Sequence, residues 1–506
     1  MQEIILPEMV AGFFIAVSLI RFFINKLENL EGMKWLPFLA LGILIALFPA
    51  YGFRPECIPL VIHALFCAAF HVPDFVLLPA RLRRAGFLEL SPFCRVLLLF
   101  LLLPVLGLAV FFAPSADPAL LEAGVASAAL RDEERGVELF LRIYGAYDNE
   151  AARNAVRGGT LGSRRPILVL IPPVSGSVGA VDQVCGELRN AGFTVVAYSR
   201  RGFDSPAVGP RGKKYPLSLN RRARLFWVES RGRAAAPANA AGRFLEAERR
   251  RDIQFLLNTI MQKSVPVSGT SAAVVADALA ETDPSTVFLA GYDAGGAALL
   301  ELAGVPDFAA RYPAVKGLIA VESPLLSSLT SEEPPPAPPP HDNWFVAFWV
   351  GVRSRALALL PKKIVGVGEV PGPDVPVCFV LSDRVMEPRY RNDRYATILK
   401  ALYNTKGPAM LAAATGAGPL DYSDIPEKYP LYRVFRPGRK RNLARGTHGP
   451  EETAALMTNF AAAVLAMGRD GAEETIPALP RKPNMLQNFH IETNDRWNSL
   501  GKGPIL

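Results

Sequence analysis

The sequence predicts a mainly parallel α/β sheet with helices on both faces and with insertions, preceded by a transmembrane helical region. Half of the 506 residues are hydrophobic, and they are most concentrated in the first 113. Beyond that region, short apolar runs typical of buried parallel strands alternate with stretches of helical pattern. The chain is too long for one typical domain, so we expect a membrane region followed by a large α/β domain.

The membrane region, residues 1–113, contains four apolar runs that are each close to the ~20 residues of a spanning helix. The runs are Pro7–Asn25, Trp35–Tyr51, Cys57–Ala80 and Phe93–Ala113. A cleaved signal peptide is not expected, because further apolar runs follow the first and no small-residue cleavage site is evident. The third run is the weakest, since His63, His71 and Asp74 interrupt it.

The basic residues between these runs predict an orientation. Lysine and arginine are frequent after the first and third runs, whereas the connection between the second and third holds only Arg54. By the positive-inside rule, the first and third connections are cytoplasmic, and the fourth run leads out of the cytoplasm. We therefore expect a multi-pass protein of the inner (cytoplasmic) membrane with an extracytoplasmic α/β domain, provided that the third run spans the bilayer.

The formal net charge is +8. This charge indicates either a solvated, arginine-rich surface or an attraction to anionic lipid head groups. Nucleic acid is not an expected partner, because the arginines are not interleaved with stacking aromatic residues. The five cysteines have no metal-binding spacing, and Cys185 and Cys378 form a disulfide only if the fold brings them together. The sequence leaves the oligomeric state open.

Five apolar runs predict buried strands, and the stretch Phe244–Gln262 predicts a crossover helix. The strands are expected at Ile167–Ile171, Phe193–Tyr198, Val287–Ala290, Gly317–Val321 and Val375–Leu381. We place the α/β domain at residues 136–475, after a connector at 114–135 that is rich in small residues and helical in pattern. The tail, residues 476–506, contains several Pro and Asn residues and is expected to pack irregularly or to be flexible.

Two segments interrupt the alternation of strands and helices. Residues 209–242 are rich in Arg, Ala and Gly and are expected to form a long loop or small insertion. Residues 323–370 are expected to form a cap that includes a proline-rich linker. Within this cap, the aromatic stretch 344–350 is either a lid or ordinary core.

The segment 291–295, Gly-Tyr-Asp-Ala-Gly, follows a predicted strand and begins a predicted helix. Its flanking glycines fit a tight strand-to-helix turn, which would push the side chain of Asp293 out over the edge of the sheet. The N-terminus of a helix favours an anion, and this suits a carboxylate nucleophile. The alternative is that Asp293 only caps the helix that follows it.

This segment resembles the nucleophile elbow of the α/β-hydrolase superfamily, with Asp in place of the usual Ser. It is similar to the elbow of the epoxide hydrolase and haloalkane dehalogenase branch. Three further segments match the superfamily in chain order: the loop 172–177, the turn 197–205 and the strand and loop 379–388. The resemblance implies that these supply, respectively, the oxyanion loop, a structural turn and the catalytic acid.

The resemblance also implies the roles of individual residues. Asp293 is the nucleophile, Asp383 the acid and His448 the base, in the chain order of the superfamily. The oxyanion hole would use backbone N–H groups of Val174, Ser175 and Ala294. His448 stands in Gly-Thr-His-Gly-Pro, after a last strand expected near Tyr432–Phe435, whereas the other four histidines lie in the membrane region, the linker and the tail.

Two assignments keep an alternative. Glu322, at the end of the predicted strand Gly317–Val321, is a rival for the acid, because some Asp-nucleophile members of the superfamily take the acid from that position. His448 is otherwise a surface loop residue.

The implied chemistry has two steps, an attack by Asp293 that forms a covalent ester and its hydrolysis by water that His448 activates. It requires no metal or cofactor. The sequence departs from both named activities: Ala294 stands where haloalkane dehalogenases usually carry a halide-binding Trp, and the predicted cap contains no Tyr. Four later tyrosines, Tyr390, Tyr395, Tyr403 and Tyr422, are candidates for the role of the missing cap tyrosines.

The membrane anchor favours a small apolar or lipid-like substrate. The alternatives are an inactive hydrolase scaffold that binds a ligand or partner at the membrane, and a function that resides in the helical region itself.

Overall fold

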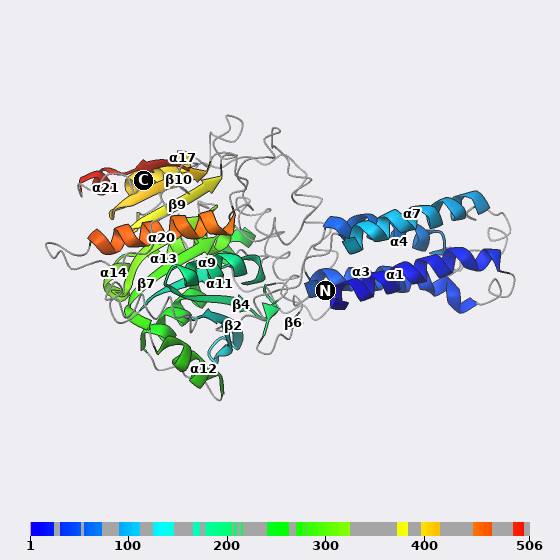
Figure 1. Ribbon diagram of the computed structural model, residues 1–506, viewed down its shortest axis with the longest axis horizontal. Helices are drawn as coiled ribbons and strands as arrows, with labels where there is room; N and C mark the ends of the chain where they lie inside the picture. Colours follow the sequence, from blue (N-terminus) through cyan, green and yellow to red (C-terminus); the bar gives the residue numbers. More distant parts are fainter. Residues whose placement is uncertain are drawn as a thin grey trace. The chain divides into compact units, whose positions relative to one another are not determined.

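The computed structural model describes most of the secondary structure of the chain in two compact units. The described residues are 2–24, 31–51, 55–72, 91–111, 125–145, 165–172, 178–204, 207–209, 214–215, 240–262, 270–280, 282–323, 372–382, 396–414, 422, 449–467 and 489–499. Figure 1 shows the elements of both units along the chain.

The described part of the N-terminal unit contains four α-helices, one in each predicted apolar run. They are α1 (Gln2–Ile20), α3 (Leu36–Tyr51), α4 (Ile58–Ala69) and α7 (Pro92–Phe111). Among the described residues, one helical stretch, Pro92–Val110, is both long and apolar enough to cross a membrane. The apolar parts of the other three helices are shorter, at 10–17 residues each. The helices themselves are confirmed, and the crossing of a membrane stays a prediction.

The larger unit is built on one nine-stranded sheet with the order β1-β2-β4-β3-β7-β8-β9-β10-β11. Its strands are β1 (Val125–Asp132), β2 (Val137–Tyr144), β3 (Arg165–Ile171), β4 (Thr194–Arg200), β7 (Thr282–Tyr292), β8 (Val315–Val321), β9 (Val377–Ser382), β10 (Ala409–Ala414) and β11 (Phe489–Thr493). The strands from β4 to β10 in this order run parallel, whereas β2 is antiparallel to β1 and β4, and β11 is antiparallel to β10.

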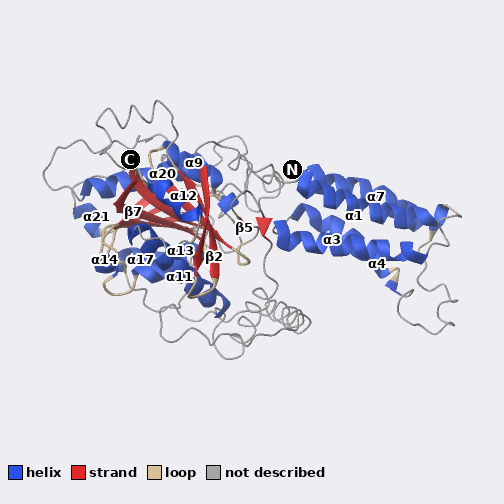
Figure 2. Ribbon diagram, turned by 90° about the horizontal axis from the view of Figure 1, so that it is seen from below, coloured by secondary structure: helices blue, strands red, loops and turns tan. Residues whose placement is uncertain are grey.

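Helices cover both faces of this sheet, as Figure 2 shows. One face packs against α11 (Ala240–Gln262), α12 (Thr270–Leu279), α13 (Ala294–Ala303), α14 (Phe308–Arg311) and α17 (Ala396–Asn404). The other packs against α9 (Asp182–Asn190), α20 (Pro450–Met467) and α21 (Asp495–Ser499). Neighbouring residues of a strand alternate between the two cores, as Leu168 and Val169 do in β3. The strands are apolar on both sides for this reason.

All five predicted strands and the predicted crossover helix are present, as β3, β4, β7, β8, β9 and α11. The helix expected in the connector is wrong at Val125–Asp132, which forms the edge strand β1. Alanine-rich sequence favours a helix, but here pairing with β2 decides, through a turn in which Gly136 has a φ of +61°. In the tail, Phe489–Thr493 forms β11 instead of packing irregularly. The strands β2 and β10 were not predicted.

Within the predicted insertion and cap, the structure describes few residues. A short antiparallel pair joins β5 (Ala207–Val208) to β6 (Lys214–Tyr215) at the start of the insertion. Residues 324–370 of the cap, including the aromatic stretch 344–350, lie outside the described residues. The strand expected near Tyr432–Phe435 lies outside them as well.

Candidate active site

Asp293 lies at the carboxyl end of β7, in the sharp turn that leads into α13. Its backbone has a φ of 49° and a ψ of −125°, a conformation that L-residues rarely adopt. The side chain is exposed and makes no capping hydrogen bond to the helix. The structure therefore does not support the alternative that Asp293 merely caps α13. Ala294 is the first residue of that helix, where backbone N–H groups have no acceptor within the helix.

The glycines around Asp293 are required by close backbone packing. A Cβ atom on Gly291 would lie 2.6 Å from the backbone nitrogen of Gly296, and a Cβ on Gly296 would overlap the hydroxyl of Ser323. A Cβ on Gly295 would lie 2.7 Å from Cγ2 of Ile171, at the end of β3. The start of the predicted oxyanion loop thus lies directly against the elbow.

Glu322 lies beside the elbow, at the end of the neighbouring strand β8. The backbone N–H of Asp293 donates to the carbonyl of Val321 at 2.9 Å, which joins the ends of β7 and β8. Glu322 also has a positive φ of 50°, and its side chain is buried. Its carboxylate accepts a hydrogen bond from the backbone N–H of Ser382, the last residue of β9. The structure brings Asp293, Ala294 and Glu322 together.

The other predicted site residues, Asp383, His448, Val174 and Ser175, lie outside the described residues. Their positions in the chain relate them to the sheet. Asp383 follows the last residue of β9, and His448 precedes α20 by two residues. The loop with Val174 and Ser175 follows β3, which pairs with β7 in the sheet. Their roles stay predictions.

Tyr422 belongs to the framework under the site. It is completely buried, its hydroxyl donates to the carbonyl of Leu381 in β9, and its own carbonyl accepts a hydrogen bond of 2.9 Å from the Tyr292 hydroxyl in β7. These bonds fix the end of β9 and exclude Tyr422 as a substrate-facing acid. Tyr403 is exposed on α17, whereas Tyr390 and Tyr395 lie outside the described residues.

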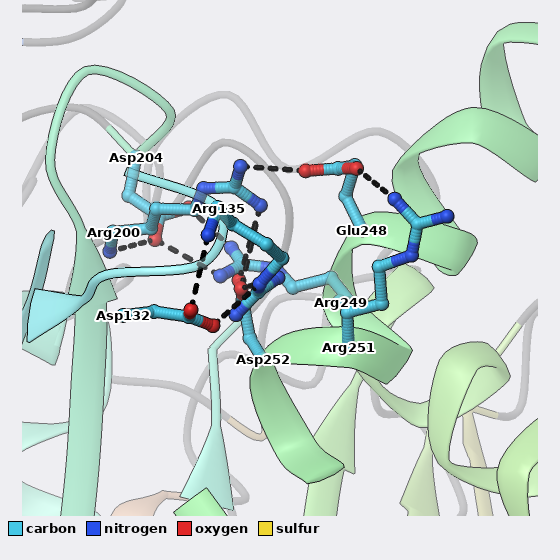
Figure 3. A network of polar contacts seen from close by, with 8 residues as sticks. All are labelled: Asp132, Arg135, Arg200, Asp204, Glu248, Arg249, Arg251 and Asp252. Atoms are coloured by element: carbon cyan, nitrogen blue, oxygen red, sulfur yellow. Dashed lines mark hydrogen bonds and ion pairs between the residues drawn. The ribbon is translucent and has the colours of Figure 1, made fainter. Parts of the chain in front are cut away.

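A cluster of buried ion pairs, the arginine cluster, links the β1–β2 turn, the end of β4 and α11 (Figure 3). It consists of Asp132, Arg135, Arg200, Asp204, Glu248, Arg249 and Asp252. Arg249 is fully buried and binds both carboxylate oxygens of Asp204, one of them at 3.0 Å. Arg135 binds Asp252 at 2.9 Å, and Arg200 binds Glu248 at 2.5 Å. The cluster fixes the turn after β4. This turn belongs to the segment 197–205, to which the resemblance to α/β-hydrolases assigns a structural role.

Electrostatics keep Arg249 charged despite its burial. Burial alone lowers its pKa, but Asp204, Tyr198 and Asp252 outweigh this effect and hold the pKa above the ordinary value. Burial likewise raises the pKa of the Tyr198 phenol, so that it stays protonated.

The expectation that the arginines form a solvated surface is therefore wrong for Arg249 and Arg200, and also for Arg142, which pairs with Asp182 at 2.7 Å inside the protein. The signal in the sequence was the i, i+3 and i, i+4 spacing of Arg249 from Asp252 and Ile253, which puts all three on the buried face of α11.

The larger unit has a mixed, mainly parallel sheet with the turn of Asp293 at the carboxyl end of the central parallel strand β7, which is the arrangement that the resemblance to α/β-hydrolases predicts. A family model described as "TP_0976_N: N-terminal domain" matches residues 2–111. This match spans the four helices of the N-terminal unit. No curated protein matches the chain.

Several solved structures are similar to the chain. A ferulic acid esterase from Streptomyces cinnamoneus is 15% identical with a TM-score of 0.40, over 70% of this chain and 94% of that one. Esterase 2 of Thermogutta terrifontis, phosphorylated by paraoxon, is 16% identical with a TM-score of 0.34, over 67% of this chain and 94% of that one. The fold assignment rests on the sheet and the elbow, and these similarities say nothing of this chain's substrate.

Proposed function

We propose that the protein is a membrane-anchored hydrolase of the α/β-hydrolase type that uses Asp293 as its nucleophile. One observation carries the proposal. Asp293 occupies a strained, glycine-flanked turn that exposes its carboxylate at the N-terminus of α13. Strained backbone of this kind is kept where the function requires it, and a loop that only connected two elements would not need it.

In the first step, a carboxylate oxygen of Asp293 attacks an electrophilic carbon of the substrate. At a saturated carbon, as in an epoxide or a haloalkane, the new C–O bond forms an ester, and the bond from that carbon to the leaving group breaks, with the electron pair going to the leaving group. At the acyl carbon of an ester substrate, the same attack forms a mixed anhydride and expels the alcohol or phenol. The N-terminal end of α13 stabilises the carboxylate before the attack, because the helix dipole favours negative charge there.

In the second step, water hydrolyses the ester. His448 takes a proton from the water, which attacks the ester carbonyl of Asp293, and Asp383 stabilises the charged imidazole. Backbone N–H groups of Ala294, Val174 and Ser175 stabilise the oxyanion until the bond to the substrate oxygen breaks. His448 passes its proton to the departing oxygen, so that the product leaves as an alcohol, or as a carboxylic acid when an acyl group was transferred. The carboxyl group of Asp293 releases its proton to solvent and is restored as the carboxylate, so that no metal or cofactor is consumed or required.

The substrate is proposed to be a small apolar or lipid-like molecule, because the N-terminal unit exposes apolar side chains as a membrane anchor would. Its helices expose large apolar side chains, among them Phe93, Phe100 and Leu103 of α7 and Phe13 of α1, each more than 60% exposed. Exposed apolar residues this numerous are typical of a lipid-facing surface. Together with the positive-inside rule, this surface supports a hydrolase unit on the extracytoplasmic side.

Turnover by the full chain in detergent tests the proposal. We would measure hydrolysis of para-nitrophenyl butyrate, styrene oxide and bromohexane by the wild type and by Asp293→Asn and His448→Ala variants. Turnover of at least one substrate that both substitutions abolish supports the proposal. Turnover that survives Asp293→Asn overturns it, and no turnover of any of the three favours the inactive scaffold that binds a ligand.

A further inference from the structure

The ends of β8 and β9 are joined in an unusual way. The two strands are parallel, and two rungs of their ladder lie four residues apart: Leu318 N–H donates to the Pro376 carbonyl at 2.9 Å, and Glu322 N–H donates to the Val380 carbonyl at 2.8 Å. In a parallel ladder, the next donor is the N–H of Ser382, and its regular acceptor is the backbone carbonyl of Glu322.

The carboxylate of Glu322 takes the place of that carbonyl. The chain leaves β8 at Glu322 through a positive φ of 50°, and the N–H of Ser382 donates to Oε1 of the Glu322 side chain instead. Both residues are buried, Glu322 with 4% of its surface exposed and Ser382 with none. A carboxylate is a strong, charge-assisted acceptor for a backbone N–H.

Because the side chain of Glu322 supplies the acceptor, the chain can turn away at the end of β8 while β9 continues for one more hydrogen bond. The turn at Glu322 takes the chain out of the sheet immediately beside the elbow, where Ser323 lies against Gly296. At the same time, β9 continues to Ser382 as though β8 had one residue more. The residue that follows Ser382 in the chain is Asp383, the predicted acid.

We propose that Glu322 is a positioning residue, which uses its carboxylate as a substitute rung to fix the end of β9, directly before Asp383 in the chain. This inference rests on the proposed function for its catalytic meaning, because it assigns the acid to Asp383 and a supporting role to Glu322. The hydrogen bond itself is independent of any activity.

A positioning residue and a catalytic acid at position 322 require different side chains, and this difference provides the test. A substitute rung needs length and an acceptor oxygen, so glutamine serves and aspartate, one methylene shorter, does not. A catalytic acid needs a charge to stabilise the imidazolium, so aspartate retains part of the role and glutamine does not. Glu322→Gln, Glu322→Asp and Glu322→Ala therefore separate the two roles.

The first measurement is hydrogen exchange of the Ser382 amide in the full chain in detergent, resolved by mass spectrometry with fragmentation. We expect exchange at Ser382 to accelerate at least about tenfold in Glu322→Asp and Glu322→Ala relative to Glu322→Gln. Glu133→Gln, an exposed carboxylate in the β1–β2 turn, is the control and should leave Ser382 exchange unchanged. Equal exchange in all three Glu322 variants overturns the inference, and if Glu322→Ala does not fold, the Gln and Asp variants decide.

The second measurement is turnover of whichever of para-nitrophenyl butyrate, styrene oxide and bromohexane the wild type hydrolyses. A positioning role predicts a higher kcat for Glu322→Gln than for Glu322→Asp, whereas a catalytic acid at this position predicts the reverse order. If the chain hydrolyses none of the three, the proposed function fails while the exchange experiment still decides whether Glu322 holds the end of β9.

Discussion

Asp293 and Glu322 lie on adjacent strand ends, and both have a positive φ near 50°. A non-glycine residue held in such a conformation costs about 1–3 kcal/mol, so two of them side by side are kept against a considerable cost. Asp293 exposes its carboxylate, and Glu322 buries its own against the N–H of Ser382. Two carboxylates in contrasting environments are the usual way in which one site holds groups with different tasks.

In the arginine cluster, each buried guanidinium group is paired with a carboxylate. Arg249 has no exposed surface and is neutralised by Asp204, which is also fully buried. Breaking such a pair from one side leaves an uncompensated charge inside the protein. We therefore expect Arg249→Leu to lower the free energy of unfolding by about 3–5 kcal/mol.

Urea unfolding of the larger unit within the full chain measures this loss. Arg251→Leu is the matched control, because Arg251 is half exposed and pairs with Glu248 at 3.2 Å, and its loss should cost at most about 1 kcal/mol. Equal losses in the two variants would show that Arg249 contributes no more than a surface ion pair.

Because of Cys378, we expect the free energy of unfolding to fall as the pH rises into the alkaline range. Burial raises the pKa of its thiol far above the ordinary value, so the folded protein holds this proton at a pH where the unfolded chain releases it. The contribution of the buried thiol to the free energy of unfolding is complete below about pH 8.5, the pKa of a free thiol. Above that pH it is lost at about 1.4 kcal/mol per pH unit. Cys378→Ala should remove this slope between pH 9 and 10 in urea unfolding (~1.4 kcal/mol). A slope identical to that of the wild type would contradict the assignment.

At the scale of elements, the sequence predicts those strands that are buried on both faces. Runs such as 167–171 and 317–321 are continuously apolar because helices cover both of their sides, and this pattern is specific to central parallel strands. β1 and β10 were missed because their alanines fit a helix equally well, and only pairing with a neighbouring strand decides.

The elbow was predictable because its chemistry is local. Glycines at 291, 295 and 296 signalled the sharp turn, and the structure gives each of them a backbone or side-chain neighbour that a Cβ would strike. The hydrogen bond from Ser382 to Glu322 joins residues that are 60 positions apart, and no pattern in the sequence predicts it. The arginine cluster is equally non-local, because it joins a turn, a strand end and a helix from three parts of the chain.

Substitution at Gly296 tests the packing of the elbow. A Cβ at this position overlaps the Ser323 hydroxyl and lies 2.6 Å from the Gly291 carbonyl, so Gly296→Ala should cost about 1–3 kcal/mol of stability. Gly186→Ala in α9 is the control, because its Cβ would meet nothing within 4 Å and alanine favours a helix by up to about 1 kcal/mol. Thermal unfolding of both variants measures the difference, and a Gly296→Ala protein as stable as Gly186→Ala would show that the elbow has room to adjust.

At the scale of the whole molecule, the chain joins a small helical unit to a large α/β unit. Their surfaces differ in kind: most of the large apolar side chains that are exposed among the described residues belong to the helical unit. A soluble four-helix bundle would bury them, so we expect lipid around these helices.

Spin labels test this expectation in liposomes. A label at Phe100→Cys should be more accessible to oxygen than to a water-soluble nickel chelate, because oxygen concentrates in the bilayer. A label at Tyr403→Cys, an exposed aromatic residue of the α/β unit, should show the reverse. Both are placed in a protein whose half-exposed Cys94 is replaced by Ser. Equal accessibility of the nickel chelate at both positions would contradict a lipid-facing α7.

The central claim is that Asp293 forms a covalent bond with the substrate, and intact-protein mass spectrometry tests it most directly. The full-length His448→Ala protein is incubated with styrene oxide and with bromohexane, and its mass is compared with that of the doubly substituted Asp293→Asn, His448→Ala protein. The account predicts a stable mass increase that maps to the peptide containing Asp293 and is absent from the double variant. An adduct that persists without the Asp293 carboxylate, or the absence of any adduct while the wild type turns over the same compound, would contradict it.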